Sequence, residues 1–571
     1  MQYKIVRRPE VNSAALSSLH PVIQKIYLAR GIESESQLAR QAVNLLHFSQ
    51  LSGMQGACDI LYQAIVEHKK ILICGDFDAD GATSTAVMIK GLRLLGTTHC
   101  DYLVPNRFDF GYGLSPALVE LAYQHRAEVI VTVDSGISCL AGVQRAKELG
   151  MQVIVTDHHL PGAVLPQADA IVNPNLHECE FPSKALAGVG VAFYLLLALR
   201  DKLRREGAFQ ANPPNLATLL DLVALGTVAD VVPLDDNNRI LVYQGLQRIR
   251  AGKACPGIQA LIEIANREQA QLVAADFGFA LGPRLNAAGR LDDMSRGIRC
   301  LLAEDLGEAR MIAAELDSLN KERREIEQSM VQDAELVLGK AQFSEGEVPD
   351  GIALYDPTFH QGVIGIVAGR IKEKHHRPVI AFAQSDEHKL KGSARSIPGL
   401  HMRDLLESIN SQHPGLINKF GGHAMAAGLE IDEVDFSRFE QIFAEQVAAV
   451  LEPGMLEGEV LSDGSLDLAQ MEMDMALLIR EAGPWGQAFP EPVFDDEFEL
   501  IQQRLVGDKH LKVMLARNGK YFDGIQFNID LSRWPNEGAK RVHVAYKLDI
   551  NRFRGKESLQ LMIEQMTALA D

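Results

Sequence analysis

The sequence predicts an α/β protein in which a doubly wound parallel-sheet domain is joined by a long helix to a smaller α/β domain, followed by a C-terminal β-barrel. Three observations support this fold class. Short apolar runs alternate with helical patterns after Lys70, as in repeated βαβ units. An amphipathic helical pattern extends from 305 to 340. After 453, runs of alternating polar and apolar residues are typical of short antiparallel strands.

Composition places the chain among ordinary globular proteins. Its 571 residues are 47% apolar and 23% charged. A chain of this length is too long to fold around a single hydrophobic core, so about two to four domains are expected. No apolar run reaches membrane-spanning length and the N-terminus lacks a signal-peptide core, so we expect a cytoplasmic protein with no membrane partner. The seven cysteines form no C-x-x-C pair, which predicts free thiols instead of zinc or disulfide sites.

The first two thirds of the chain predict a helical lead-in followed by a parallel sheet. Helical patterns around 22–28 and 38–46 indicate the lead-in. Strands are then expected at 71–74, 100–104, 129–133, 153–156 and 170–172, with helices at 83–95, 115–125 and 140–149. Ligands of such sheets bind beyond the carboxyl ends of the strands.

Acidic residues and histidines follow three of these predicted strands. They are Asp76, Asp78, Asp80, Asp134, Asp157, His158 and His159. A further acid, Asp230, lies in an apolar run, where a carboxylate needs a partner. Carboxylates gathered at one sheet edge repel one another unless a cation lies between them, and oxygen ligands favour hard divalent ions. The pattern therefore predicts a site for Mg²⁺ or Mn²⁺.

The first acidic segment, GDFDADG at 75–81, permits other interpretations when taken alone. It could be a solvated acidic turn. It matches the start of a calcium-binding loop, but Val87 would occupy the twelfth position, and a strand stands where that loop needs a helix. Residues 78–81 also resemble haloacid dehalogenase phosphatases, which have no place for the Asp134 segment or the paired histidines. A lone histidine is more often a surface or core residue than a ligand; two adjacent ones at a strand end favour a site.

The second α/β unit, at 350–450, carries residues suited to phosphate binding. Strands are expected at 352–355 and 379–382. Ser393 and Arg395 occupy one face of another likely strand, where they could hold a terminal phosphate. Gly421 and Gly422 permit close backbone approach to phosphate. The simpler alternatives are a surface ion pair for the arginine and an ordinary turn for the glycine pair.

Charge is distributed unevenly along the chain. The net charge is −19, which argues against general coating of nucleic acid. Residues 500–560 reverse this sign, with twelve Lys or Arg against six acids, a net +6. Strands are expected there at 510–516, 521–529, 541–550 and 558–566, after a helix at 471–481. A basic barrel on an acidic body suits a protein that holds nucleic acid in one restricted region.

Taken together, these segments resemble the DHH phosphoesterase superfamily. The residues that carry this resemblance are GDFDADG (75–81), VDSG (133–136), TDHH (156–159) and GTVADVVPL (226–234). Later segments make it specific to the bacterial RecJ exonuclease family: VPNRFDFGYGLS (104–115), GPRLNAAGRLDD (282–293), HQGVIGIVAGRI (360–371), KGSARS (391–396) and KFGGHAMAAGL (419–429). The resemblance covers nearly the whole chain, in matching order.

The resemblance implies a domain order. It implies a DHH catalytic domain, a connecting long helix, a DHHA1 substrate-binding domain and an oligonucleotide-binding (OB-fold) barrel. With the helical lead-in at 1–50, we expect these parts at 51–300, 301–345, 346–452 and 453–571.

The resemblance also implies site residues. Ligands for two Mn²⁺ or Mg²⁺ ions would be Asp78, Asp80, Asp134, His158 and Asp230. Asp134 would bridge the ions, Asp76 would be an outer ligand, and His159 would lie against the scissile phosphate. Relatives often have histidine where this chain has Cys74, and this departure leaves the coordination of one metal open.

A second implied group would bind the DNA end. Arg107, Arg284, Ser393 and Arg395 match a 5′-phosphate pocket, and Gly421, Gly422 and His423 would lie beside it. Phe108 and Tyr112 could stack bases at its mouth, although buried aromatic residues are the commoner case.

The function implied is single-strand-specific 5′→3′ DNA exonuclease activity by a two-metal mechanism, releasing 5′-mononucleotides in recombination and repair. Expected partners are single-stranded DNA, a single-strand DNA-binding protein and a RecQ-type helicase. One alternative is a DHH phosphodiesterase for short oligonucleotides, against which the basic barrel speaks. The other is a non-catalytic single-strand-binding scaffold, in which the ligand residues need not be present.

Overall fold

The computed structural model describes residues 3–11, 13–106, 112–340, 348–386, 388–507, 509–553 and 555–570. The chain divides into two compact units. The N-terminal unit comprises Val11–Asn320 with Ile479–Glu491, and the C-terminal unit comprises Met1–Glu10, Lys321–Leu478 and Pro492–Asp571. No helix within the described ranges is long and apolar enough to cross a membrane.

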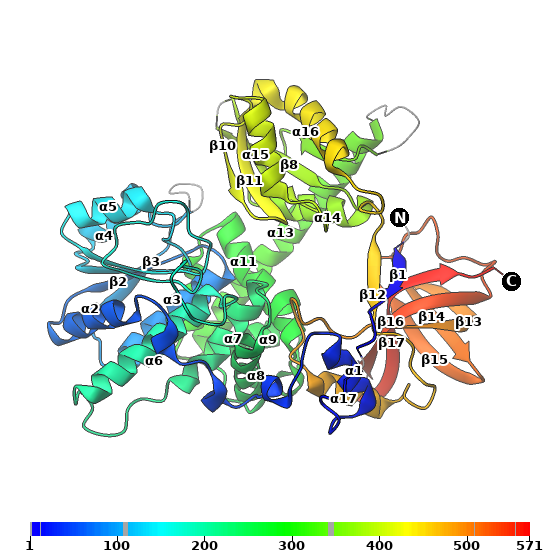
Figure 1. Ribbon diagram of the computed structural model, residues 1–571, viewed down its shortest axis with the longest axis horizontal. Coiled ribbons are helices and arrows are strands. Elements are labelled where there is room, and N and C mark those ends of the chain that lie inside the picture. The colour runs from blue at the N-terminus through cyan, green and yellow to red at the C-terminus, as the bar shows by residue number, and fades with distance from the viewer. Residues whose placement is uncertain are drawn as a thin grey trace. The chain divides into compact units, whose positions relative to one another are not determined.

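A five-stranded sheet in the order β3-β2-β4-β5-β6 forms the centre of the N-terminal unit, and every neighbouring pair is parallel (Figure 1). The strands are β2 (Ile71–Gly75), β3 (Cys100–Leu103), β4 (Val129–Val133), β5 (Gln152–Thr156) and β6 (Ala170–Val172). After β2 the chain first adds β3 on one side and then crosses to add β4 on the other. The gap beyond the ends of β2 and β4 is therefore the switch point where such sheets bind ligands.

Helices complete the parallel-sheet layer as the sequence predicts. Helices α4 (Pro116–Gln124) and α5 (Leu140–Glu148) pack on the sheet face that carries Leu72 and Ile130. Helix α3 (Ala79–Leu94) packs against α6 (Gly188–Arg205) and α7 (Leu220–Ala229). The sequence pattern placed the start of α3 at 83, whereas the helix begins at Ala79. The helix begins earlier because Asp78 caps its N-terminus: the Asp78 side chain accepts a hydrogen bond from the Gly81 N–H at 2.9 Å.

A helical region completes the N-terminal unit. It contains α2 (Met54–Val66), α8 (Asp236–Arg250), α9 (Pro256–Ile264), the short α10 (Ala274–Asp276), the π-helical turn η6 (Phe277–Leu281), α11 (Gly282–Leu291) and α12 (Ser295–Leu302). Helix α13 (Leu306–Lys340) then runs 35 residues and leads into the C-terminal unit. The long helix predicted at 305–340 is thus confirmed.

The lead-in differs from the prediction. Among the described residues of the lead-in, α1 (Pro21–Leu28) is the one α-helix, and the segment around 38–46 contains the short 3₁₀ turns Glu35–Leu38 and Ala42–Asn44. The chain instead opens with strand β1 (Lys4–Arg7), which pairs in parallel with β12 (Glu459–Ser462). Because that partner lies about 450 positions away in sequence, no local pattern could reveal the pairing.

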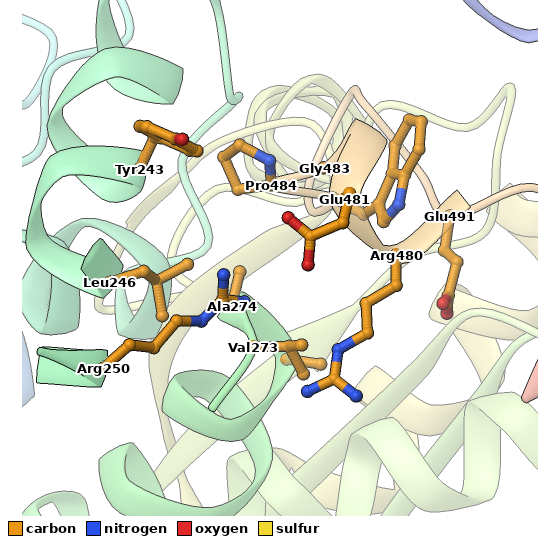
Figure 2. Close-up of a pocket in the computed structure, with 12 residues that line it drawn as sticks. Tyr243, Leu246, Arg250, Val273, Ala274, Arg480, Glu481, Gly483, Pro484 and Glu491 are labelled. Carbon is orange, nitrogen blue, oxygen red and sulfur yellow. The ribbon is translucent and has the colours of Figure 1, made fainter. Parts of the chain in front are cut away.

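The segment Ile479–Glu491 returns to the helical region of the N-terminal unit. Figure 2 shows Arg480 and Glu481 across from Leu246 and Arg250 of α8. Together with Tyr243 these residues line a cavity of about 70 Å³. Arg480 donates a hydrogen bond to the carbonyl of Gln271, and Trp485 stacks on Phe489 with ring centroids 5.1 Å apart. These contacts anchor the segment, and the cavity is too small for more than a few waters.

Besides the β1–β12 pair, the described part of the C-terminal unit contains two larger sheets of different design. The first has the order β10-β11-β9-β8-β7 and is mixed, with α14 (Ile364–His375), α15 (Met402–Gln412) and α16 (Phe436–Val450) as its helices. Its strands are β7 (Ile352–Tyr355), β8 (Val379–Asp386), β9 (Lys389–Arg395), β10 (Lys419–Gly422) and β11 (Ala426–Asp432). A buried core that includes Phe382, Phe439 and Phe443 joins this sheet to α15 and α16.

The second sheet is a closed barrel in the order β13-β14-β15-β17-β16, orange to red in Figure 1. Its strands are β13 (Phe494–Val506), β14 (His510–Arg517), β15 (Lys520–Gln526), β16 (Arg541–Phe553) and β17 (Lys556–Ala568), preceded by α17 (Met473–Ala482). Four of the strands were predicted, and β13 was missed. Two adjacent acids, Asp495 and Asp496, interrupt its apolar alternation, and both are buried because they bind partners inside the protein.

Candidate metal centre

Four side chains converge beyond the ends of β2 and β4. Asp80 lies in the first turn of α3, Asp134 ends β4, His158 follows β5, and Asp230 ends α7. The Nε2 atom of His158 is 3.1 Å from Oδ1 of Asp134, 3.4 Å from Oδ2 of Asp230 and 3.9 Å from Oδ2 of Asp80. Residues spread over 150 positions thus present oxygen and nitrogen atoms to one small volume.

Three overlapping groups of these side chains have the geometry to hold a cation. Within each group the ligand atoms lie within 4.8 Å of one another. The groups are Asp80, His158 and Asp230; Asp76, Asp78 and Asp134; and Asp134, His158 and His159. Because Asp134 belongs to two groups and His158 to two, adjacent ions could share ligands, as two-metal sites require.

The start of α6 fixes the position of Asp80 and its neighbour. The backbone N–H groups of Gly188 and Val189 donate to Oδ2 and Oδ1 of Asp80 at 2.6 and 2.8 Å. A Cβ atom at Gly188 would lie 2.5 Å from the Cβ of Asp134, so only glycine permits this approach. Gly188 was not among the site residues predicted from the sequence. Its only signal is a glycine at the start of a helix, which is too common to indicate a site.

Burial and mutual repulsion strongly perturb the acids of this cluster. Burial, and next the charge of Asp78, raise the pKa of Asp80 to about 7. Burial and the charge of Asp80 raise the pKa values of Asp134 and Asp230 well above the usual value. Burial, followed by the charge of His159, lowers the pKa of His158 to about 4. Neutral imidazole and carboxylates that need a counter-charge are the forms in which a divalent cation is bound.

Two buried polar atoms without hydrogen-bond partners among the described residues also indicate a cation site. Oδ1 of Asp134 and Nε2 of His158 are buried and lack a hydrogen-bond partner among the described residues. Their 3.1 Å separation does not have hydrogen-bonding geometry. Buried polar atoms without a partner are costly, and a shared cation would satisfy both at once.

His159 is held differently from His158. Its Nδ1 is 2.7 Å from Oδ1 of Asp157, a buried carboxylate that also accepts hydrogen bonds from the backbone N–H groups of Ile137, His158 and His159. Burial acts to lower the pKa of His159, but the Asp157 hydrogen bond and charge outweigh it and raise this pKa to about 9. Asp157 therefore orients and charges the second histidine, a role that sequence reasoning did not assign to it.

Comparison with known proteins agrees with this geometry. A family model described as "DHH family, N-terminal domain" matches residues 70–227, "DHHA1 domain" matches 349–451, and "RecJ OB domain" matches 462–565. The single-stranded-DNA-specific exonuclease RecJ of Salmonella typhimurium is 58% identical over 575 residues, covering 100% of both chains. The chain belongs to the RecJ family.

Other RecJ proteins extend the comparison. The single-stranded-DNA-specific exonuclease RecJ of Escherichia coli is 57% identical over 98% of each chain. Among solved structures, RecJ from Thermus thermophilus in complex with Mn²⁺ is 30% identical, with a TM-score of 0.79 over 100% of this chain and 80% of that one. The α/β sheet domain, the smaller α/β domain and the closed barrel predicted from the sequence are thereby confirmed as a RecJ architecture. The exact domain bounds stay predictions.

The position where many DHH phosphatases and some RecJ proteins were expected to carry histidine is part of the core here. Cys74 lies in β2, which is buried along its whole length, and packs in the cluster formed with α4 and α5. Burial raises the pKa of its thiol to about 12, so the sulfur stays protonated. A protonated thiol is a poor metal ligand, so the cation groups of this chain rely on carboxylates and imidazoles.

Of the two aromatic residues predicted to stack bases, Phe108 and Tyr112, the structure describes Tyr112. Arg107 and Phe108 fall outside the described residues. Tyr112 is 46% exposed, and its hydroxyl donates to the Asp134 carbonyl at 3.5 Å. Its ring meets His159 and Phe77 edge-on, with centroids 6.2 and 6.1 Å away. Tyr112 thus borders the metal cluster and still presents part of its ring to solvent.

The expected phosphate-binding residues belong to both units, and each group is described within its own unit. In the N-terminal unit Arg284 is buried, pairs with Asp317 at 2.9 Å and donates to the Ala280 carbonyl at 2.6 Å. In the C-terminal unit Arg395 donates to Ser393 Oγ at 3.1 Å. Arg284 is thus already committed to an internal ion pair, which the sequence could not reveal.

The surroundings of Arg395 suit an anion. No acidic side chain pairs with it in the described part of the chain, and burial lowers its pKa. A Cβ atom at Gly365, in the first turn of α14, would lie 2.8 Å from its Nη2, so glycine leaves space beside the guanidinium. Gly421 and Gly422 of β10 pair with β11, which pairs with β9, and the His423 N–H donates to the Ala426 carbonyl. The glycines and Ser393 therefore share neighbouring rungs of one sheet.

Proposed function

We propose that this chain is a single-strand-specific DNA exonuclease that hydrolyses phosphodiester bonds with two divalent cations, Mn²⁺ or Mg²⁺. The observation that carries the proposal is the convergence of Asp80, Asp134, Asp230 and His158, with two buried ligand atoms lacking partners among the described residues. The RecJ relatives named above for this activity support the substrate class.

The ligand assignment follows the geometry of the cluster. One cation would be held by Asp80, His158 and Asp230, and the other by Asp76 and Asp78, with Asp134 shared. Cations bound there would lower the pKa of an attacking water and offset charge on the phosphate. The chain itself supplies the positions, because α6 backbone donors, the Asp78 cap and the ends of β2 and β4 hold the carboxylates before substrate arrives.

His159 would contribute a positive charge beside the scissile phosphate. Its Nδ1 donates to Asp157, which leaves Nε2 as the donor available to a phosphate oxygen. An imidazolium stabilises the negative charge that builds on phosphorus-bound oxygens during displacement. Asp157 acts through His159 and is a positioning residue.

The polarity of degradation would come from binding the DNA end. Ser393 and Arg395, with the backbone of Gly421, Gly422 and His423, would hold a 5′-phosphate. Arg284, which the resemblance adds to this group, would need to exchange its Asp317 partner in order to bind a phosphate. An enzyme that anchors the 5′ end and cuts one phosphate further along must release 5′-mononucleotides in the 5′→3′ direction. The barrel with its +6 segment would track the remaining strand.

The family resemblance supports a wider setting. We propose that the enzyme acts in the cytoplasm in DNA recombination and repair, with a single-strand DNA-binding protein and a RecQ-type helicase as partners. A helicase would supply the single strand that the nuclease requires.

A hydrolysis assay tests the proposal. The full-length protein with Mn²⁺ should release mononucleotides from a 5′-phosphorylated single strand and leave a blunt duplex intact. Asp80→Ala should abolish release, whereas the control Asp101→Ala, an exposed acid on β3, should not. Faster cleavage of dinucleotides than of long strands would instead indicate a short-oligonucleotide phosphodiesterase. Tight strand binding without metal-dependent release would indicate a scaffold.

A further inference from the structure

The turn η6 exposes an aromatic side chain where the surrounding chain is tightly packed. Phe279 is 82% exposed, whereas Phe277, Ala280 and Leu281 of the same turn are buried. Burying a phenylalanine ring is favourable, so a ring left in water becomes informative where other observations at the same element point to a ligand. The π-helical form of the turn points the same way, since such turns occur frequently at functional sites.

This turn packs directly on the helix that ends at the metal cluster. A Cβ at Gly278 would lie 3.8 Å from Cγ1 of Val228, and one at Gly282 would lie 3.1 Å from the Cβ of Ala229. Asp230, a member of the cluster, follows Ala229 immediately. Phe279 therefore belongs to an element that touches the last turn of α7, the helix that ends at Asp230.

Two further contacts hold η6 in place. The buried Arg284 donates to the carbonyl of Ala280 at 2.6 Å and pairs with Asp317. In α11, the Asn286 side chain accepts a hydrogen bond from the Ala79 N–H at 2.8 Å, next to the acidic segment. The ring thus projects from a rigid support, which is what a binding platform requires.

A second exposed apolar residue directly follows the end of α7. Val231 directly follows Asp230, is 62% exposed, and has φ +61°. A β-branched residue in the left-handed region is strained, and such strain persists where surrounding structure imposes it, commonly at functional sites. The backbone turn after Asp230 therefore leaves a second apolar side chain in solvent beside the same helix end.

We propose that Phe279 is a stacking platform for a base of the single-stranded substrate beside the metal cluster, with Val231 as an apolar neighbour. This inference rests on the proposed function. An aromatic face stacks on every base, so the contact would position the strand without selecting its sequence. Phe279 would act on substrate binding and not on the reacting atoms.

The test separates stacking from a structural role. With 5′-phosphorylated single strands, Phe279→Ala should raise KM about tenfold with little change in kcat, and Phe279→Trp should restore it. An abasic residue at one position near the 5′ end of the strand should raise the wild-type KM by a similar factor. The same abasic residue should cause no further increase in the KM of Phe279→Ala. The matched control is Tyr123→Ala, which removes a 52% exposed ring at the C-terminal end of α4, toward the opposite edge of the sheet.

A binding readout keeps this inference independent of catalysis. In EDTA, a single strand can carry 2-aminopurine at the same position near its 5′ end. The fluorescence of that base should be quenched when the strand binds wild type or Tyr123→Ala, and it should not be quenched when the strand binds Phe279→Ala. Absence of hydrolysis by wild type would overturn the proposed function, and the quenching would still report on stacking. A KM for Phe279→Ala within twofold of wild type would overturn the stacking role. An equal increase in the wild-type KM for an abasic residue at every position of the strand would also overturn it.

Discussion

The backbone N–H of Gly188 donates a 2.6 Å hydrogen bond to Oδ2 of Asp80, 108 positions earlier in the chain. The glycine also lets α6 approach Asp134, since a Cβ there would lie 2.5 Å from the Asp134 Cβ. One small residue thus sets the distance between two carboxylates of the metal cluster.

Gly188→Ala should therefore reduce nuclease activity by about 100-fold or more, because small displacements of catalytic groups have large effects on rate. Steady-state rates with Mn²⁺, together with a melting curve, measure this. The control is Gly369→Ala in α14, where an added Cβ meets nothing within 4 Å. Full activity in Gly188→Ala would show that the close approach does not matter.

Divalent cations should stabilise the N-terminal unit. The buried carboxylates have raised pKa values because burial disfavours their charge and they repel one another, and a bound cation removes that repulsion. At a free Mn²⁺ concentration 100 times Kd, the gain is about 2.7 kcal/mol. Calorimetry with Mn²⁺ and with EDTA should show the shift in melting temperature, and Asp134→Asn should reduce it. An equal shift in that variant would contradict the assignment.

Asp157→Asn should lower kcat about 10- to 100-fold without loss of the fold, because the variant no longer supplies the charge that orients and protonates His159. Rates on long strands and Mn²⁺ affinity should be measured together. A change in metal affinity with unchanged kcat would place Asp157 in support of the cations instead.

Arg395→Ala should remove discrimination between 5′-phosphorylated and 5′-hydroxyl strands. The guanidinium has no acidic partner among the described residues and would contribute about a tenfold effect on KM through charged hydrogen bonds. Arg438→Ala, which changes an arginine on α16, is the matched control. If the preference for a 5′-phosphate persists in Arg395→Ala, the DNA end is bound elsewhere.

Acid should destabilise the barrel in a window set by Asp495. Burial acts to raise its pKa, but hydrogen bonds from Arg7, Ser462 and His543 lower it to about 2 from the usual 3.8. A lowered folded-state pKa contributes stability that is complete above the unfolded value and is lost as pH falls from about 4 to about 2.

Fluorescence can follow that transition. The chain has two tryptophans, so in a Trp485→Phe background Trp534 reports on the C-terminal unit alone. Melting temperatures between about pH 5 and about pH 2.5 should fall less steeply when Asp495→Asn is added. Parallel pH profiles for both proteins would mean that other acids dominate.

Much of the fold was predictable because its signals are local. The strands at 71–74, 129–133 and 170–172 are apolar runs bounded by turn residues, and the structure places them within a residue of these bounds. The closing strand β13 was missed because Asp495 and Asp496 break its pattern, and their partners, Arg7 and Tyr546, are distant in sequence. Strand β1 was missed for the same reason, since its partner β12 is also distant in sequence.

By itself, the sequence determined which residues end the parallel strands, and so which carboxylates and histidines share one sheet edge. Parallel strands align their carboxyl ends, which makes that inference a matter of local pattern and topology. Only the tertiary structure decided that Gly188 holds Asp80, that Asp157 holds His159, that Arg284 is committed to Asp317, and that Phe279 stays in solvent. Periodicity records that a side chain is buried or exposed, but the partner it meets depends on how distant segments pack.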